Sequence, residues 1–533
     1  MGIIEIFISQ TVDAWNGLMH FEGFDGFFGA LQTLLWSPPM VIVLVGAGLY
    51  FSIRTRFLQL RKIKKMVKLL LGGSSSEKGV SSFQAFAMAV AGRVGTGNIV
   101  GVATAIAYGG PGAMFWMWFI AFIGSGTAFV ESTLAQLYKE EIDGEYRGGP
   151  AYYFDKSGLK FFSVAFMIAA ILAEAILKPS VQSNAIVTAI SENFGVSTMV
   201  PMIITVVLLA LIIIGGTKGI AKAASILVPV MSLSYILVAI LIILLNIGKV
   251  PHVFGEIFSG AFGLNAALGG SLGWAIIWGV KRGVFSNEAG QGTGAHAAAA
   301  AEVSHPAKQG LVQAFSVYFD TLLVCSATGL AILITGTYQT FNTGQGKNAD
   351  GLFQVYKGYE GNSNFQELLT NTVGHGSAES ISMFTPQAFN TLLTGFGGKF
   401  VAIALFFFAF TTLMAYYYYA ETNLELLLKK YSEKLRFYCR SVLKVIFLCS
   451  AFFMGLKTNA AAWNIADTGF AIMVWINIIG ILIISKPALL ALKDFERREK
   501  AKTDNEMFDV SELEEDEKPY FDGVIFWRKK SSK

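Results

Sequence analysis

The residues from Lys281 to Gly294 read Lys-Arg-Gly-Val-Phe-Ser-Asn-Glu-Ala-Gly-Gln-Gly-Thr-Gly, an unusual run for the interior of an apolar segment. The surrounding segment begins near Leu272 and resumes as the alanine run Ala295–Ala301. A glycine costs a helix about 1 kcal/mol, and a charge at bilayer depth costs about 2.5 kcal/mol or more. Backbone leaves the helix inside a membrane only where protein or a watery cavity satisfies its polar groups. The run therefore predicts a broken membrane helix whose gap faces a binding site.

A second interruption of the same kind lies earlier in the chain. The apolar run Phe83–Tyr108 contains Gly92-Arg93-Val94-Gly95-Thr96-Gly97-Asn98. Two interrupted helices at corresponding places in the two halves of a membrane protein are typical of the substrate site of a secondary transporter.

The composition places the chain in a membrane. Hydrophobic residues make up 53% of the 533 residues, charged residues 15%, and the mean hydropathy is +0.53. A soluble domain carries nearer 25% charged residues. The three cysteines have neither the pairing nor the spacing of a disulfide framework or a zinc site. The first 20 residues carry Glu5 and Asp13 and lack a basic region, so they do not read as a signal peptide.

Hydropathy predicts eleven membrane spans, each of which needs about 20 mostly apolar residues. They lie at 39–51, 83–108, 114–136, 161–193, 200–214, 223–245, the broken segment from 272, 311–334, 396–428, 441–456 and 468–484. A basic cluster follows the first span, which predicts an N-terminus outside and a C-terminus in the cytoplasm. We expect an extracellular or interfacial segment at 1–38, a transmembrane domain at 39–485 with an external insertion at 337–390, and a hydrophilic cytoplasmic tail at 486–533.

The positions of the two breaks predict the architecture. Without the first span ten remain, and the broken spans are the first and the sixth of these. Five spans per half give the second half the opposite orientation in the membrane. The expected fold is therefore all-α and polytopic, an inverted five-plus-five repeat with one extra N-terminal helix and a site near the midplane.

The residues of the first break suit a carboxylate. Backbone amides at Thr96, Gly97 and Asn98, at the start of a half-helix, can donate to an anion with the help of the helix dipole. Glycine lets a small ligand approach the backbone closely. The alternative is that these glycines only allow helices to pack together.

Oxygen-bearing side chains elsewhere suit an ammonium group or a sodium ion. Phe285-Ser286-Asn287 offers a hydroxyl, an amide and carbonyl oxygens, ligands that a hard cation prefers, although Ser286 could instead bond to its own helix. Adjacent hydroxyls at Thr411 and Thr412 lie in an apolar segment. Tyr416 is four residues after Thr412 and so shares its helix face.

Other polar residues in the spans leave alternatives open. Gln182 is a lone amide that could link helices or contact a ligand. Charged residues in the spans are expected to form structural pairs, although Glu288 lies in the gap and could carry a proton. A channel is a further alternative, but its filter would normally come from several subunits. The sequence has no phosphate-binding loop, zinc-type histidine pair or nucleophile elbow, so we do not expect an enzyme.

These motifs resemble those of the alanine/glycine:cation symporters. The resemblance rests on Gly95–Ile99, Gly109–Gly112, Trp278–Gly290, His305–Gly310 and Trp463–Asp467, and it covers the chain from about Pro39 to Lys486. It implies a leucine-transporter-type fold in the amino acid-polyamine-organocation superfamily. It also implies sodium-coupled, sometimes proton-coupled, import of small neutral amino acids, alanine and glycine first, across the cell membrane.

The resemblance also implies roles for individual residues. The family's carboxylate-holding backbone falls at Thr96 and Gly97, and its side-chain contacts fall at Asn98, Gln182, Phe285, Ser286, Asn287 and Thr412. A sodium site would use the carbonyl of Val94 with Thr411 and Thr412. Where a Trp commonly lines the pocket, this chain has Tyr416. Sodium is expected as the coupling ion, with no cofactor and no nucleic acid, and we expect the protein to function as a monomer in the bilayer.

Overall fold

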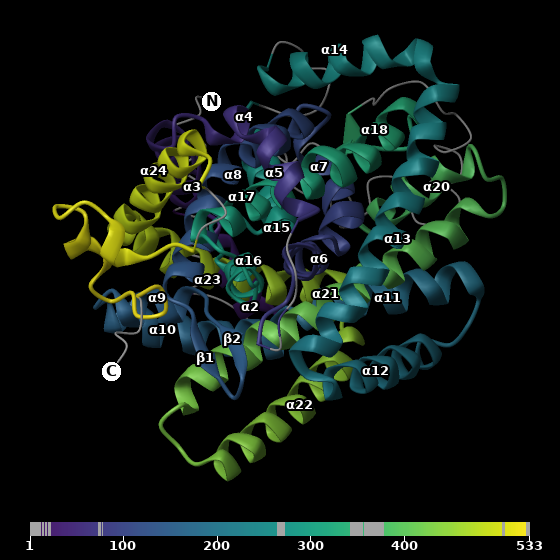
Figure 1. Cartoon of the computed structure of the whole chain (residues 1–533). Coiled ribbons are helices and arrows are strands. Elements are labelled where there is room, and N and C mark those ends of the chain that lie inside the picture. Colours follow the sequence, from purple (N-terminus) through teal and green to yellow (C-terminus); the bar gives the residue numbers. More distant parts are fainter. Residues whose placement is uncertain are drawn as a thin grey trace.

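Helices form nearly all of the regular structure (Figure 1). The computed structural model describes Val12, Trp15, Met19 and residues 23–72, 76, 78–263, 272–341, 355–356, 378–503 and 507–528. The first half contains α2 (Gly23–Leu35), α3 (Pro38–Arg54), α4 (Leu58–Arg61), α5 (Ile63–Leu70), α6 (Ser82–Arg93), η1 (Gly97–Gly101), α7 (Val102–Gly109), α8 (Ala113–Leu137), α9 (Pro150–Lys156), α10 (Lys160–Leu172), η2 (Ala173–Leu177), α11 (Pro179–Phe194), α12 (Met199–Ile214), α13 (Gly216–Leu245) and α14 (Val250–Ala261).

The second half continues the same helical pattern. It contains α15 (Leu272–Asn287), α16 (Thr293–Ala299), α17 (Pro306–Val317), the π-helix η5 (Tyr318–Cys325), α18 (Ser326–Thr335), α20 (Phe384–Asn390), α21 (Gly397–Leu428), α22 (Glu433–Gly455), α23 (Asn459–Ile484) and α24 (Lys486–Ala501). Two short antiparallel strand pairs accompany the helices. One joins β1 (Glu140–Ile142) with β2 (Glu145–Arg147), and the other joins β3 (Thr340–Phe341) with β4 (Val355–Tyr356).

A helix occupies each predicted span, although not every one is long enough to cross a bilayer alone. Among the described residues, seven helices are long and apolar enough to cross a membrane, or up to nine if two bent pairs count as one span each. The bent pairs are α2 with α3, at 44°, and α6 with the η1–α7 segment, at 55°. The shorter α12 and α15 have 16 residues each. The count of eleven spans stays a prediction.

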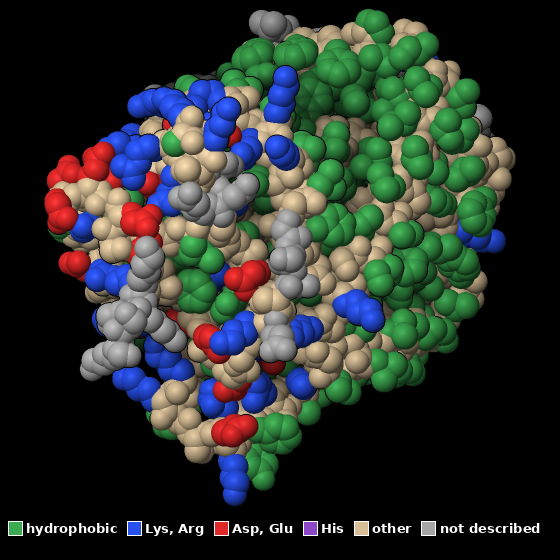
Figure 2. All heavy atoms as spheres, in the orientation of Figure 1, with side chains coloured by type: hydrophobic (Ala, Val, Ile, Leu, Met, Phe, Trp, Pro, Cys, Tyr) green, Lys and Arg blue, Asp and Glu red, His purple; other side chains and the backbone are tan. Residues whose placement is uncertain are grey.

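The outer helices present apolar side chains to their surroundings. Exposed large hydrophobic residues recur along α12, α13 and α22, with Leu211 65%, Val230 66% and Val445 61% exposed. Figure 2 shows hydrophobic side chains covering the face where α12 and α13 lie, while charged side chains gather around α24 and the β1–β2 hairpin. This division between an apolar belt and a charged end is what a polytopic membrane protein needs.

The two broken helices lie inside this belt, around α8. That helix contacts α15, α16 and α17. Glycines allow the approach: a Cβ added at Gly279 would lie 2.6 Å from the carbonyl oxygen of Ala113, and one at Gly283 would lie 2.5 Å from Cγ2 of Ile120. Gly283 therefore allows α15 to pack against α8.

The chain ends differ from the sequence expectation. The predicted extracellular or interfacial segment 1–38 contains α2, which packs against α23, while most of residues 1–22 lie outside the described residues. The external insertion 337–390 is described only at 337–341, 355–356 and 378–390. The tail is more than a hydrophilic extension. Trp527 is buried and its indole N–H donates to the carbonyl oxygen of Gln136 at 2.7 Å, which folds the tail back onto the end of α8.

Candidate functional site

The first break falls between α6 and η1, as predicted. The last helical turn of α6 ends at Val94, whose ψ of 91° is extended rather than helical. The side-chain oxygen of Asn98 accepts the backbone N–H of Gly95 at 2.9 Å and so ties the turn together. A Cβ added at Gly97 would lie 3.2 Å from Phe285 and 3.3 Å from the Cα of Ser286. The first break therefore packs through this glycine against the last turn of α15, just before the second break.

The second break is shorter than the sequence suggested and begins later. The residues from Lys281 to Asn287 are helical and belong to α15, which corrects the expectation that the backbone is already unwound at Phe285. The break runs from Glu288 to Gly292, with left-handed φ values of 56° at Glu288 and 96° at Gly290. Charges at Lys281 and Arg282 do not interrupt the helix because both pair with Asp467 on α23, at 2.9 Å and 3.2 Å.

A buried carboxylate joins the two broken helices. Asp320, on η5, accepts the amide of Asn98 at 2.7 Å and the hydroxyl of Ser286 at 2.8 Å. It also accepts the hydroxyl of Thr321 at 2.8 Å. The amide of Asn287 donates to Thr321 at 3.2 Å. Two of the predicted site residues, Asn98 and Ser286, thus donate to one acidic side chain, and Asn287 is linked to it through Thr321. The sequence argument had classed this acid only with the structural charge pairs.

Gln182 connects the first break to α21. Its amide oxygen accepts both the backbone N–H and the hydroxyl of Thr96, at 3.1 and 2.7 Å. Its amide nitrogen donates to the hydroxyl of Tyr416 at 3.3 Å. The ring of Tyr416 lies 3.9 Å from Nζ of Lys178, a cation–π distance. Tyr416 is therefore close to the break, and its hydroxyl and its ring each have a specific partner.

Both threonine hydroxyls of α21 donate to the carbonyl oxygen of Phe408, Thr412 at 2.9 Å, but their second neighbours differ. The hydroxyl of Thr412 lies 3.3 Å from the carbonyl oxygen of Val94, as a shared cation site would require. The hydroxyl of Thr411 hydrogen-bonds to the carbonyl oxygen of Phe408 at 3.0 Å and lies 3.7 Å from the sulfur of Met231 on α13. The structure therefore brings Thr412 to the break, and directs the Thr411 hydroxyl to α13.

Glu288, the residue considered for proton transfer, is ion-paired. Its carboxylate lies 3.3 Å from Nζ of Lys178 and accepts the hydroxyl of Thr293 at 2.7 Å. Lys178 also pairs with Glu174 at 2.8 Å. Together these contacts hold the second break against η2 and α11, which agrees with the structural pairing expected for charges in the spans.

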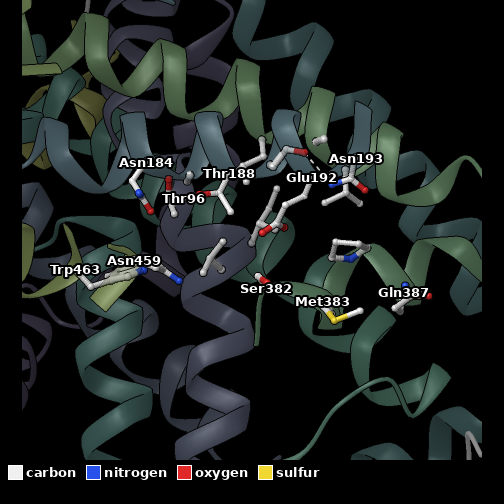
Figure 3. A pocket seen from close by; sticks show the side chains of 18 residues that line it. Thr96, Asn184, Thr188, Glu192, Asn193, Ser382, Met383, Gln387, Asn459 and Trp463 are labelled. Carbon is white, nitrogen blue, oxygen red and sulfur yellow. Dashed lines mark hydrogen bonds between the residues drawn. The ribbon is translucent and has the colours of Figure 1, made fainter. Parts of the chain in front are cut away.

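A cavity of about 360 Å³ leads to the first break. Thr96 lies at one end, and Glu192 and Asn193 at the other, with walls from α11, α20, α21 and α23 (Figure 3). Trp463 lines it beside Thr96 and packs against Phe285, with 5.1 Å between the ring centroids. Phe285 is 5% exposed, and its ring lies between Gly97 of the first break and Trp463 of the cavity wall. Such a cavity gives a small solute a route to the Thr96 backbone.

Sequence reasoning missed two groups that hold the site together. Asp320 is a single acid in an apolar segment, and its partners come from two other helices. Asn477 on the neighbouring helix α23 donates to the carbonyl oxygen of Gly290 at 2.9 Å and so holds the backbone of the second break. The only available signal was a polar residue in the middle of a span.

Comparison with known proteins decides the family. The model of the sodium:alanine symporter family matches residues 22–357 and 362–509. This chain belongs to the sodium:alanine symporter family. Its members are transporters, so the prediction that the chain is not an enzyme is confirmed, as is the resemblance to these symporters.

Two relatives of this symporter family are similar over most of their length. The "Putative sodium/proton-dependent alanine carrier protein YrbD" of Bacillus subtilis is 54% identical over 477 residues, which cover 89% of this chain and 93% of that protein. The sodium/proton-dependent alanine carrier protein of Bacillus sp. strain PS3 is 46% identical over 88% of this chain and all of its own length.

A solved structure supports the fold. The crystal structure of MhsT in complex with L-phenylalanine superposes with a TM-score of 0.53 at 14% identity, over 85% of this chain and 97% of that one. This likeness supports a leucine-transporter-type helical fold for the symporter. It carries no information about the substrate.

Proposed function

We propose that this protein is a secondary active transporter that imports small neutral amino acids, alanine or glycine, together with sodium by alternating access. The observation that carries the proposal is the close approach of the first break to the last turn of α15 at Gly97. There the backbone of the first break lies against Phe285 and Ser286, at distances that leave little room for an added methyl group. A ligand held in this space is small. Membership in the symporter family and the names of the two relatives support an amino acid as that ligand.

The substrate carboxylate would bind the backbone at Thr96 and Gly97, near the start of the half-helix that continues into α7. Helix N-termini attract anions through their amides and the helix dipole. The Thr96 N–H, which donates to Gln182 in this structure, would exchange that partner for the carboxylate. The ammonium group would then face the end of α15, where Ser286, Asn287 and the last-turn carbonyls supply oxygen acceptors. Gln182 and Tyr416 border this space, and Phe285 would close it toward the cavity. All nine predicted substrate residues remain part of this proposal.

Sodium would bind between the carbonyl oxygen of Val94 and the hydroxyls of Thr411 and Thr412. Of the two threonines, Thr412 has the better position because its hydroxyl is 3.3 Å from that carbonyl. We add Asp320 as a second cation ligand. Its carboxylate, with the hydroxyl oxygens of Ser286 and Thr321 beside it, offers the oxygen ligands that a hard cation prefers.

The coupling ion could instead be a proton, because both relatives carry "sodium/proton-dependent" in their names. Glu288 was the first candidate, but Lys178 already balances its charge. Of Glu288 and Asp320, Asp320 is the better proton carrier, since the side chains that donate to its carboxylate, Asn98, Ser286 and Thr321, are all neutral.

The remaining topology is part of the proposal. The charge distribution supports an N-terminus outside and a C-terminus in the cytoplasm, and the cavity of Figure 3 would then open to the outside. The two breaks support an inverted five-plus-five repeat with one extra helix. The site is built within one chain, which supports a functional monomer.

Uptake of labelled alanine into proteoliposomes tests the proposal. We expect saturable uptake that an inward sodium gradient drives against the alanine gradient. Linear, unsaturable flux would indicate a channel. Uptake driven equally by a proton gradient in sodium-free medium would assign the coupling to protons.

A further inference from the structure

A basic pocket of about 550 Å³ lies where the end of α3 meets α24, far from the substrate breaks in the sequence. Six cationic side chains and one carboxylate, Glu496, are the charged groups that line it; the cations are Arg54, Arg56, Arg61, Lys493, Arg497 and Lys500. Figure 2 shows Lys and Arg side chains gathered at this corner of the molecule, where α4, α5 and α24 lie in Figure 1.

Part of this charge is used inside the protein. Arg61 pairs with Glu496 at 2.8 Å and donates to the carbonyl oxygen of Thr55 at 3.0 Å, so it forms a fixed wall. Arg497 pairs with Asp494, and Lys493 pairs with Glu517 at 2.7 Å. These pairs hold α24 and the folded tail in place.

The rest of the charge has no counterpart. Among the residues that the structure describes, Arg56 and Lys500 have no ion pair, and Arg54 donates only to the hydroxyl of Tyr50, at 3.3 Å. Like charges around one pocket repel each other, and a bound anion or screening by dissolved salt reduces this repulsion. The docking of α24 does not explain this excess, because its Glu496 and Glu499 already bind α4 and α5.

The pocket adjoins an apolar surface. Ile53, Phe57 and Leu60, on α3 and α4 and the turn between them, are 62%, 39% and 60% exposed. Ile53 directly precedes Arg54 in the sequence, and Phe57 and Leu60 lie between Arg56 and Arg61. An anion with hydrocarbon chains could therefore place its charge in the pocket and its chains along these side chains.

We propose that this pocket binds the phosphate headgroup of an anionic phospholipid, with its acyl chains against α3 and α4. Basic pockets at the cytoplasmic ends of spans bind such headgroups. The lipid would bridge the end of the first span and α24, which carries the folded tail, and so fix the tail to the membrane. Free inorganic phosphate shares the headgroup chemistry but would gain nothing from the exposed apolar residues.

Native mass spectrometry of the full-length protein in detergent tests this binding, with dioleoyl phosphatidylglycerol as the probe and dioleoyl phosphatidylcholine as the neutral comparison. The variant is Arg56→Gln with Lys500→Gln. The control is Lys64→Gln with Lys68→Gln on α5, which removes the same charge from exposed residues outside the pocket. One basic side chain near an anionic surface changes binding about fivefold, so the pocket variant should bind phosphatidylglycerol about 25-fold more weakly.

The expected result is equal phosphatidylglycerol binding by wild type and control, weak phosphatidylcholine binding by all, and binding that weakens as KCl rises. The salt series on wild type keeps the test decisive if the pocket variant fails to fold. The proposal is overturned if the pocket variant binds phosphatidylglycerol as well as the control does, or if salt has no effect. It is also overturned if millimolar inorganic phosphate displaces the lipid completely, which would make the pocket a site for soluble anions.

Discussion

Replacing Asp320 with asparagine removes one charge from the centre of the two breaks and leaves the shape nearly unchanged. The carboxylate accepts three hydrogen bonds, from Asn98, Ser286 and Thr321, at 2.7–2.8 Å. An asparagine can accept on only one side. If its oxygen faces the two hydroxyls, its NH₂ group faces the NH₂ of Asn98. That amide cannot simply turn over, because its oxygen already accepts the N–H of Gly95.

The loss of sodium affinity in Asp320→Asn can be estimated from these contacts. A hydrogen bond to a charged group contributes about 1.5–3 kcal/mol. If a bound cation loses a comparable amount when the carboxylate becomes an amide, its affinity falls about 10- to 100-fold, since 1.4 kcal/mol is tenfold. We therefore expect Asp320→Asn to raise the half-saturating sodium concentration for alanine uptake by that factor.

The assay is uptake of labelled alanine into proteoliposomes over a series of sodium concentrations. Ser286→Ala, which removes one hydroxyl and no charge, should shift the sodium requirement less and serves as a milder variant. Monodisperse elution and an unchanged unfolding temperature establish that each variant is folded. A folded Asp320→Asn protein with the sodium and pH dependence of wild type would refute the role given to this carboxylate.

Three further outcomes follow from the geometry. Gly95→Ala should abolish alanine uptake while sparing expression, because its Cβ would lie 2.5 Å from the hydroxyl oxygen of Thr412; wild-type uptake would show that the break can relax. Thr412→Ala should raise the sodium requirement more than Thr411→Ala does, since only the Thr412 hydroxyl reaches the Val94 carbonyl; equal shifts in sodium titrations would reverse this assignment. Burial lowers the pKa of His305, whose ring caps α17, so near pH 6.5 the folded state binds fewer protons than the unfolded state. The stability of this end of α17 should then fall as the pH drops through about 6.5. Backbone amide hydrogen exchange there should become faster, after correction for the intrinsic pH dependence of exchange. His305→Asn should lose that pH dependence while keeping a cap.

The breaks could be predicted from the sequence because glycines and polar residues inside apolar segments have a direct energetic meaning. The start of the second break could not. Lys281 and Arg282 suggested an interruption, but both form ion pairs with Asp467, which lies nearly 190 residues further along the chain. The helix therefore continues to Asn287, and only the glycine-rich part unwinds.

Asp320 and the tail illustrate a second limit. Asp320 matters because Asn98 and Ser286, from two distant segments, donate hydrogen bonds to it, and no spacing in its own helix predicts those partners. The tail was expected to be hydrophilic because its charged residues dominate the average. Its few aromatic residues are nevertheless well placed: Phe508 and Trp527 are buried, and their ring centroids are 5.8 Å apart.

Equilibrium binding of labelled alanine to the purified protein, with and without sodium, tests the central claim most directly. If the two breaks hold the amino acid and the ion together, sodium must tighten alanine binding, and alanine must tighten sodium binding by the same factor. We predict a clear increase in alanine affinity when sodium replaces choline, and a much smaller increase in Asp320→Asn. Equal alanine affinity in sodium and in choline, at constant pH, would contradict sodium-coupled binding at this site.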